Sequence, residues 1–204
     1  RDDGRWVTSG TPDDYVTGRI DRVNIDTGEF TTLYDKIGTS RIRGPNDLAF
    51  DAHGGFWFTD PGKTRHRDWD RGSVCYAKMD GSFIQEIIFP IHKPNGVGLS
   101  PDGKTLYFSS KGHSTMGGYD IFKSTMGEGG WSVPVNLGCP TNTALDDVYF
   151  VLSADGKYGF YSSEKDIFAF IEKCMSNDTE GILKGLNDLN EQFVNNYIKR
   201  YKKQ

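Results

Sequence analysis

Alternating apolar and polar positions recur through about residue 164 and predict short β-strands joined by tight turns. Three segments repeat this pattern: PNDLAFDAHGGFWFTD from Pro45, PNGVGLSPDGKTLYFSS from Pro94 and DDVYFVLSADGKYGFYSS from Asp146. Each opens with a small polar pair, continues as an alternating apolar run, turns at glycine and ends in an aromatic-rich run. Self-similarity at a period of roughly 20–50 residues is typical of repeat architectures, and paired strands favour a β-propeller.

The spacing of the repeats sets the expected number of blades. Asn46 and Asn95 lie 49 residues apart, and Asp147 follows 52 residues later. At about fifty residues per blade, residues 1–164 supply about three blades of four-stranded antiparallel sheet. We therefore expect a mostly β protein, a partial β-propeller whose first strands turn at residues 26–28 and 80–81.

From residue 165 the pattern changes to apolar positions spaced by three and four. These positions predict an amphipathic helix, and they include Ile182, Leu186, Leu189, Phe193 and Tyr197. We therefore expect two parts, β-propeller blades over 1–164 and a helical tail over 165–204.

Composition narrows the possible partners. The 25 glycines and 13% aromatic residues favour a turn-rich β protein. The formal net charge of the chain is −4, whereas nucleic-acid binders carry clustered basic residues. No apolar run approaches the roughly 18 residues that predict a membrane span. We therefore expect neither a nucleic-acid partner nor a membrane span.

The three cysteines suggest no metal site. Cys75, Cys139 and Cys174 are odd in number and share no ligand spacing. We expect them to be buried free thiols, because free cysteine packs as a small apolar residue. A bridge between Cys75 and Cys139 is the alternative.

The first half of the chain carries a family's motifs. They are GPNDLAFDAHGGFWFTDPGKT, RGSVCYAKMDGS and KPNGVGLSPDGKTLY. Through them, residues from about Gly4 to Phe108 resemble the senescence-marker-protein/gluconolactonase family of six-bladed propellers. The resemblance implies hydrolysis of a small lactone, often one derived from a sugar, with one divalent cation at the propeller axis. It places Asn46 at the substrate and metal site and makes Asn95 a direct metal ligand.

The same resemblance implies two acidic elements. One is a glutamate from the first blade, at a position that would precede Arg1. The other is an aspartate in a PDG motif, about fifty residues after the second asparagine, which serves as metal ligand and general base. The repeat register assigns this second role to Asp147, with Asp146 as the alternative because the SADGK segment carries an extra residue.

The second half of the propeller region is similar to a different family. Residues 107–164 contain GGYDIF, GGWSVPVNLG and SADGK, and through these they resemble WD-like periplasmic propeller repeats found beside OmpA-type domains. That resemblance implies a non-enzymatic binding or scaffolding surface in the bacterial envelope, and a periplasmic location. Residues 1–106 are then lactonase-like, residues 107–164 are a WD-like repeat, and a chimeric or composite chain becomes an expectation.

The residues permit a metal site of low charge. Ca²⁺ takes six to eight oxygen ligands, whereas Asn46, Asn95 and Asp147 supply two amides and one carboxylate. We expect Ca²⁺ or Zn²⁺ to bind weakly and to polarise the lactone carbonyl, while Asp147 accepts a proton from water. The structural alternative is that the Pro-Asn pairs form turns and that Asp147 caps a strand.

Three blades do not close a propeller ring, so their outer faces need a cover. The candidates are a homodimer of half-propellers, the helical tail, or a larger assembly.

The two resemblances lead to three hypotheses for the function. The chain is a metal-dependent lactone hydrolase with an incomplete site, a non-enzymatic envelope scaffold, or a composite chain without activity.

Overall fold

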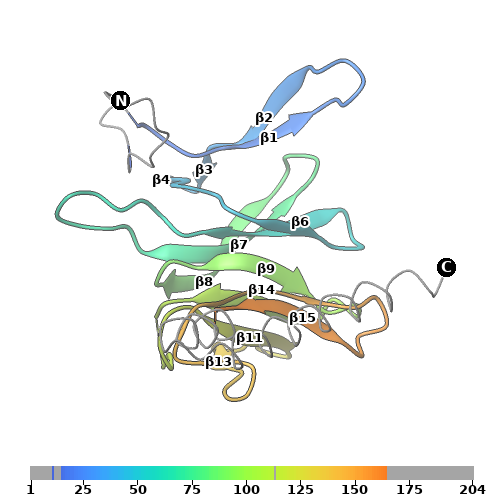
Figure 1. Ribbon diagram of the computed structural model, residues 1–204. Helices are drawn as coiled ribbons and strands as arrows, with labels where there is room; N and C mark the ends of the chain where they lie inside the picture. The colour runs from blue at the N-terminus through green and yellow to red at the C-terminus, as the bar shows by residue number, and fades with distance from the viewer. Residues whose placement is uncertain (1–10, 12–14, 113, 165–204) are drawn as a thin grey trace, which may run out of the picture. The chain divides into compact units, whose positions relative to one another are not determined.

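The computed structural model describes residue 11, residues 15–112 and residues 114–164 (Figure 1). All regular secondary structure in this part is β-strand, as expected, and the described residues contain no helix able to cross a membrane. The helix predicted for 165–204 lies outside the described residues.

The first complete blade is a four-stranded antiparallel sheet in the order β5-β6-β7-β8. Its strands are β5 (Leu48–Phe50), β6 (Gly55–Asp60), β7 (Gly72–Lys78) and β8 (Ile84–Ile91). The predicted turn at Asp80–Gly81 joins β7 to β8, with Gly81 at a φ of 84°. Glycine suits this turn because it has no Cβ, which at a left-handed φ would lie too close to the backbone.

The second complete blade is organised around β11, with the path β12-β11-β10-β9 and with β13 also paired to β11. Its strands are β9 (Asn95–Leu99), β10 (Thr105–Ser110), β11 (Asp120–Gly127), β12 (Gly130–Trp131) and β13 (Val135–Asn136). Two short strands therefore share the place of a single fourth strand.

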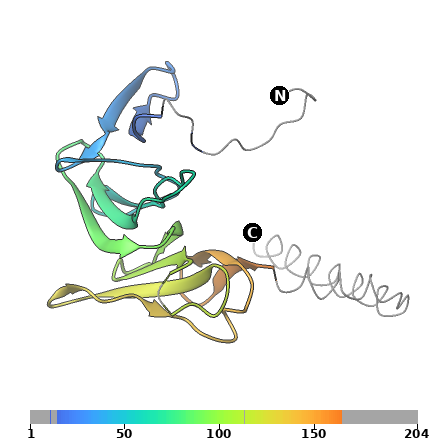
Figure 2. The ribbon, with the colours of Figure 1, turned by 90° about the vertical axis from the view of Figure 1, so that its left-hand side faces the viewer.

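Three two-stranded sheets complete the described part. They are the hairpin of β1 (Ile20–Val23) with β2 (Phe30–Tyr34), the pair β3 (Lys36–Ile37) with β4 (Ser40–Arg41), and the hairpin of β14 (Asp147–Leu152) with β15 (Gly159–Ser163). Figure 2 shows the sheets following one another in chain order, from the blue β1–β2 to the orange β14–β15. The described residues thus form a partial propeller, with two complete blades between two two-stranded hairpins.

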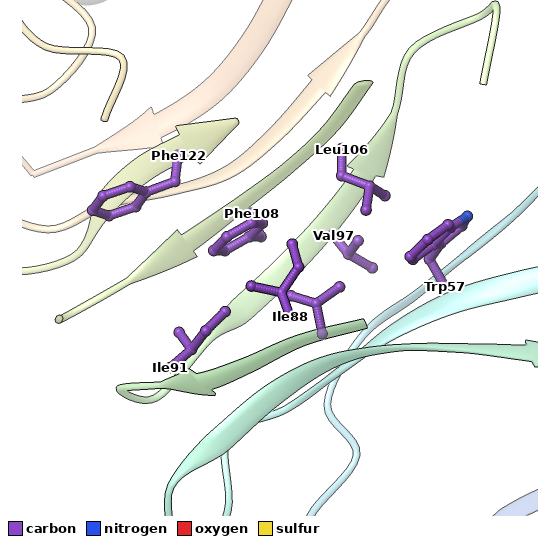
Figure 3. Packing of buried hydrophobic residues seen from close by; sticks show 8 residues of the cluster. Trp57, Ile88, Ile91, Val97, Leu106, Phe108 and Phe122 are labelled. Carbon is purple, nitrogen blue, oxygen red and sulfur yellow. The ribbon is translucent and has the colours of Figure 1, made fainter. Parts of the chain in front are cut away.

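The core lies between the sheets, in two clusters. One joins the complete blades (Figure 3) and consists of Trp57, Val74, Ile88, Ile91, Val97, Leu106, Phe108 and Phe122. The other consists of Tyr34, Ile42, Phe56, Phe58, Cys75 and Ala77. Side chains alternate between the faces of a strand, so β6 places Trp57 in one cluster and Phe56 and Phe58 in the other.

The two described cysteines have different surroundings. Both are free thiols, so the Cys75–Cys139 bridge is not formed. Cys75 is buried as expected, but the expectation is wrong for Cys139, which is exposed because it lies in the loop after β13. Burial raises the pKa of the Cys75 thiol to about 12, and the thiolate is the reactive form.

We expect iodoacetamide at about pH 8 to alkylate Cys139 in the native protein and to leave Cys75 unmodified. Peptide mass spectrometry measures this directly, and the same reaction in denaturant, where both residues should react, is the control. Equal labelling of the two residues in the native protein would contradict the burial of Cys75.

Candidate functional site

Asn46 and Asn95 occupy equivalent places at the entrance to the first strand of each complete blade. The Asn46 amide donates to the Thr59 carbonyl at 2.9 Å, and the Thr59 amide donates to the Asp47 carbonyl at 3.1 Å. In the next blade Asn95 is paired with Ser109, beside a similar irregularity of register. The repeat predicted from the sequence therefore holds for these two asparagines.

The structure also brings the two asparagines to neighbouring positions. Asn46 Oδ1 accepts a long hydrogen bond of 3.4 Å from the Gly96 amide, and Asp47 Oδ2 accepts one of 3.1 Å from the Val97 amide. The side chains at the start of β5 thus bind the backbone at the start of β9. The side chain of Asn46 thus contacts Gly96, the residue that follows Asn95 in the sequence.

The side-chain oxygen of Asn95 makes no hydrogen bond within the described residues. This Oδ1 atom is also buried. A buried acceptor without a partner costs about 1–3 kcal/mol, and such groups in native structures call for an explanation such as a bound ion. An amide oxygen is a ligand type that hard cations accept.

The turn after β14 repeats the turn after β9. In each, a serine hydroxyl donates to the aspartate two residues later at 2.6 Å, and the serine amide donates to the carbonyl five residues later at 2.8 Å. These serines are Ser100 and Ser153, which lie 53 residues apart. The shared turn fixes the alignment of the two hairpins without a gap.

This alignment corrects the expected register of Asp147. Counting back from the turn matches Tyr149 to Gly96, and the two residues have left-handed φ values of 61° and 62°. Val148 then matches Asn95, and Asp147 lies one position earlier. The comparison placed an extra residue in the SADGK segment, which holds none; the extra residue lies before the turn, because Asp147 is six positions before Ser153 and Asn95 is five positions before Ser100.

Asp147 is completely buried and only partly satisfied. Its amide donates to the Tyr119 carbonyl at 2.7 Å, and its Oδ2 accepts from the Thr143 amide at 2.6 Å. Its Oδ1 has no partner in the described part of the chain. The carboxylate therefore both closes a local turn and keeps one oxygen available.

The carboxylate of Asp146, the alternative acid, is used in structural contacts with Tyr119 and Lys111. Its Oδ1 accepts from the Tyr119 amide at 2.8 Å and lies 3.5 Å from Lys111 Nζ. These contacts hold the segment before β14 against the start of β11.

The sequence comparison missed Asp60, which shapes the approach to Asn46. Its carboxylate accepts hydrogen bonds from the amides of Arg43 at 2.7 Å, Gly44 at 2.8 Å and Gly62 at 3.0 Å. Because Gly44 directly precedes Pro45 and Asn46, Asp60 is a positioning residue for the loop. The sequence signal that could have identified Asp60 is its place in the TDPG segment, directly after the aromatic-rich run.

A hollow of about 190 Å³ lies beside Asn46. It is lined by Arg19, Ile20, Asp21, Pro45, Asn46, Asp47, Leu48 and Phe58. The hollow therefore lies between β1 and the start of β5.

A larger cavity of about 680 Å³ lies at the other end of the strands, where the turns after β5 and β9 meet. Its wall includes the aromatic side chains of Trp57, Tyr76 and Trp131. Of its two acids, Asp51 and Asp102, the first accepts hydrogen bonds within a turn. Burial tends to raise the pKa of Asp51, but hydrogen bonds from the Gly55 and His53 amides and the Tyr76 hydroxyl lower it below the ordinary value.

The donor set fits a divalent cation in part. Among the described residues, Asn95 Oδ1 and Asp147 Oδ1 are buried oxygens without a hydrogen-bond partner, and a bound cation would supply one. Within residues 11, 15–112 and 114–164, however, no group of three or more His, Cys, Asp or Glu side chains could hold a metal ion. Amide, carbonyl and water oxygens would therefore have to supply most of the six to eight ligands of a Ca²⁺ site.

Comparison with known sequences finds lactonases. The family described as SMP-30/gluconolactonase/LRE-like region matches residues 14–128. The lactonase drp35 of Staphylococcus saprophyticus is 31% identical over 137 residues, which are 65% of this chain and 40% of that protein. The gluconolactonase of Zymomonas mobilis is 33% identical over 116 residues, covering 53% of this chain and 31% of that protein. The chain spans less than half of the length of these curated relatives.

Comparison with solved structures finds the same fold. A gluconolactonase from Xanthomonas campestris is 27% identical with a TM-score of 0.56, covering 71% of this chain and 49% of the other. The periplasmic gluconolactonase of Pseudomonas aeruginosa is 18% identical with a TM-score of 0.50, covering 76% of this chain and 46% of the other. At that identity the second likeness concerns the fold alone.

Proposed function

Because this chain belongs to the SMP-30/gluconolactonase/LRE-like family, we propose that it contributes part of the active site of a metal-dependent lactone hydrolase. The observation that carries this proposal is the buried Oδ1 of Asn95, which has no hydrogen-bond partner among the described residues. Asn46, whose own Oδ1 makes only a 3.4 Å hydrogen bond to the Gly96 amide, lies beside it. The chemistry of known relatives named as lactonases supports the same reaction class.

A divalent cation such as Ca²⁺ or Zn²⁺ would supply Lewis-acid polarisation of the lactone carbonyl. Asn95 would hold that cation, and Asn46 would bind either the cation or the substrate. The low charge of two amide ligands predicts weak binding, because carboxylate ligands set much of the affinity for hard cations.

Asp147 is the proposed acid of the site, as a ligand and general base. Its Oδ1, which has no hydrogen-bond partner within residues 11, 15–112 and 114–164, supports that role, while its register one residue before the position of Asn95 favours a capping role. A general base must reach the water that it activates, and Asp147 is completely buried. Asn95 is therefore the more informative residue to test.

The experiment compares lactone hydrolysis by the full chain in EDTA, in Ca²⁺ and in Zn²⁺. We expect turnover that requires the cation, and we expect Asn95→Ala to weaken cation binding by roughly 10- to 100-fold or more. Asn95→Asp, which adds a charge at the same position, should bind the cation more tightly. Calorimetric titration of the metal alone measures binding independently of activity.

Asn24→Ala is the matched control, because Asn24 is an exposed amide that accepts hydrogen bonds only from its own turn, at Asp26 and Thr27. It should leave cation binding unchanged. An Asn95→Ala protein that binds the cation as well as the parent chain would overturn the site. A folded parent with neither turnover nor cation binding would favour the non-enzymatic scaffold.

A further inference from the structure

The cavity of about 680 Å³ between the two complete blades has the size of a site for a small organic ligand, since such sites usually measure roughly 300–1,000 Å³. The turns after β5 and β9 form part of its wall, and β6, β7, β8, β11 and β12 supply the rest. Asn46 and Asn95 lie at the opposite ends of β5 and β9. The cavity is therefore separate from the candidate lactonase site.

Three aromatic rings of the wall contact one another. The ring of Trp57 packs against those of Tyr76 and Trp131, with centroids 5.0 Å and 4.8 Å apart. Figure 3 shows Trp57 at one end of the cluster that joins the blades, so the rings continue the apolar core toward the cavity. Aromatic faces attract organic cations as well as apolar groups.

Two carboxylates line the same cavity, Asp51 in the turn after β5 and Asp102 in the turn after β9. Hydrogen bonds from the Ser100 hydroxyl at 2.6 Å and the Lys104 amide at 3.0 Å lower the pKa of Asp102. Burial tends to raise the pKa of Asp51, but its hydrogen bonds hold it below the ordinary value. Both carboxylates are therefore charged at neutral pH.

The hydroxyl groups of the wall already donate to these carboxylates. Ser100 Oγ donates to Asp102 Oδ1, and Tyr76 Oη donates to Asp51 Oδ2 at 2.9 Å. Within the described part of the chain, neither lysine nor arginine is among the lining residues. The wall thus offers ring faces and carboxylate oxygens, which favour a ligand that brings a positive charge.

We propose that this cavity binds a small organic cation, an amine or quaternary ammonium group joined to an aromatic or branched apolar body. Asp51 and Asp102 attract the charge of the ligand. The rings of Trp57, Tyr76 and Trp131 contact its apolar body and the carbon atoms around its nitrogen.

Lys78 supports the recognition of a cation by Tyr76. Its Nζ lies 5.6 Å from the centroid of the Tyr76 ring and donates to the His53 carbonyl at 2.9 Å. Lys78 is not among the residues that line the cavity, and its hydrogen bond is exposed. Solvent and salt screen such a charge, so its repulsion of a bound ligand is small.

The test titrates benzyltrimethylammonium into the full chain in EDTA. Calorimetry measures the affinity, and tryptophan emission reports on the cavity because Trp57 and Trp131 line it. We expect saturable binding at one site with a Kd below about 1 mM. Benzyl alcohol, which keeps the ring and lacks the charge, should bind roughly tenfold more weakly.

Asp102→Asn should weaken binding of the cation by roughly two- to fivefold, because it removes one charge and keeps the oxygen that the turn needs. Asp155→Asn is the matched control. Asp155 Oδ1 accepts hydrogen bonds from the Ser153 hydroxyl at 2.6 Å and the Lys157 amide at 3.1 Å, so it holds an equivalent turn, but it does not line the cavity. This variant should bind the cation as the parent chain does.

Trp131→Leu tests the aromatic part of the wall and should weaken binding of the cation by roughly fivefold. Trp69→Leu is its control, because the Trp69 side chain is exposed and does not line the cavity. It should leave the affinity unchanged, and circular dichroism checks that both variants are folded.

Three results would each overturn the proposal. They are equal affinities for the cation and benzyl alcohol, equal affinities of Asp102→Asn and Asp155→Asn for the cation, and no saturable binding by the folded parent chain. Asn95→Ala should bind the probe as the parent chain does. Because the measurement uses neither a metal nor a lactone, this proposal can fail while the proposed function stands, and the reverse.

Discussion

Replacing Phe108 with alanine should lower the free energy of unfolding by about 3–5 kcal/mol. Phe108 is 1% exposed and lies at the centre of the cluster between the complete blades (Figure 3). Its ring stacks on that of Phe122, with centroids 6.1 Å apart and an interplanar angle of 17°. The cavity left by the ring is costly because packed sheets relax only partly around it.

Urea denaturation followed by tryptophan fluorescence measures this effect. Phe50→Ala is the matched control, because Phe50 is 63% exposed and its loss should cost about 0.5 kcal/mol or less. Similar losses in the two variants would contradict the assignment of Phe108 to the shared core.

Asn142→Ala should lower the free energy of unfolding by about 3 kcal/mol. The buried Asn142 side chain binds the backbone of β11 in the way that a neighbouring strand would, through both the N–H and the C=O of Ile121. Its Oδ1 accepts from the Ile121 amide at 2.8 Å and its Nδ2 donates to the Ile121 carbonyl at 2.9 Å and to Asn136 Oδ1 at 2.6 Å. Alanine would leave the backbone polar groups of a buried residue without these partners.

The same denaturation experiment with Asn24→Ala supplies the comparison, since Asn24 also accepts backbone hydrogen bonds but in an exposed turn. Its loss should cost about 1 kcal/mol or less, because water replaces the missing partner. An Asn142→Ala protein as stable as Asn24→Ala would show that the side chain is dispensable to β11.

Much of the fold could be predicted from the chain because local rules determine it. The alternation of apolar residues defined the strands, and the Asp-Gly turns fixed the hairpins. The equivalence of Asn46 and Asn95 followed from a repeat whose two copies keep the same spacing from the turn.

The register of Asp147 could not be predicted in the same way. A left-handed tyrosine leaves no signal in a hydrophobic pattern, because L-residues other than glycine, asparagine and aspartate rarely adopt that conformation. The shared turn matches Tyr149 to Gly96, so the acid lies one position before the place of Asn95. Exposure of Cys139 was missed because composition does not show where a loop leaves the sheet.

The contacts that shape the candidate site were equally hidden. Asp60 binds amides 16 and 17 residues earlier in the chain, and Asp47 binds an amide 50 residues later. Such pairings are made only when sheets pack against one another. The unsatisfied oxygen of Asn95 is a property of its finished surroundings and has no counterpart in the sequence.

The strand β6, buried along its whole length, makes the two cores dependent on each other. Alternate side chains of β6 enter different clusters. Separating a neighbouring sheet from β6 therefore exposes the apolar side chains of one cluster, and it also loosens β6, which the other cluster needs. Stability is therefore shared across the blade junctions instead of being held within single blades. The first and second complete blades should therefore unfold together in one cooperative step, even though no strand is hydrogen-bonded into both sheets.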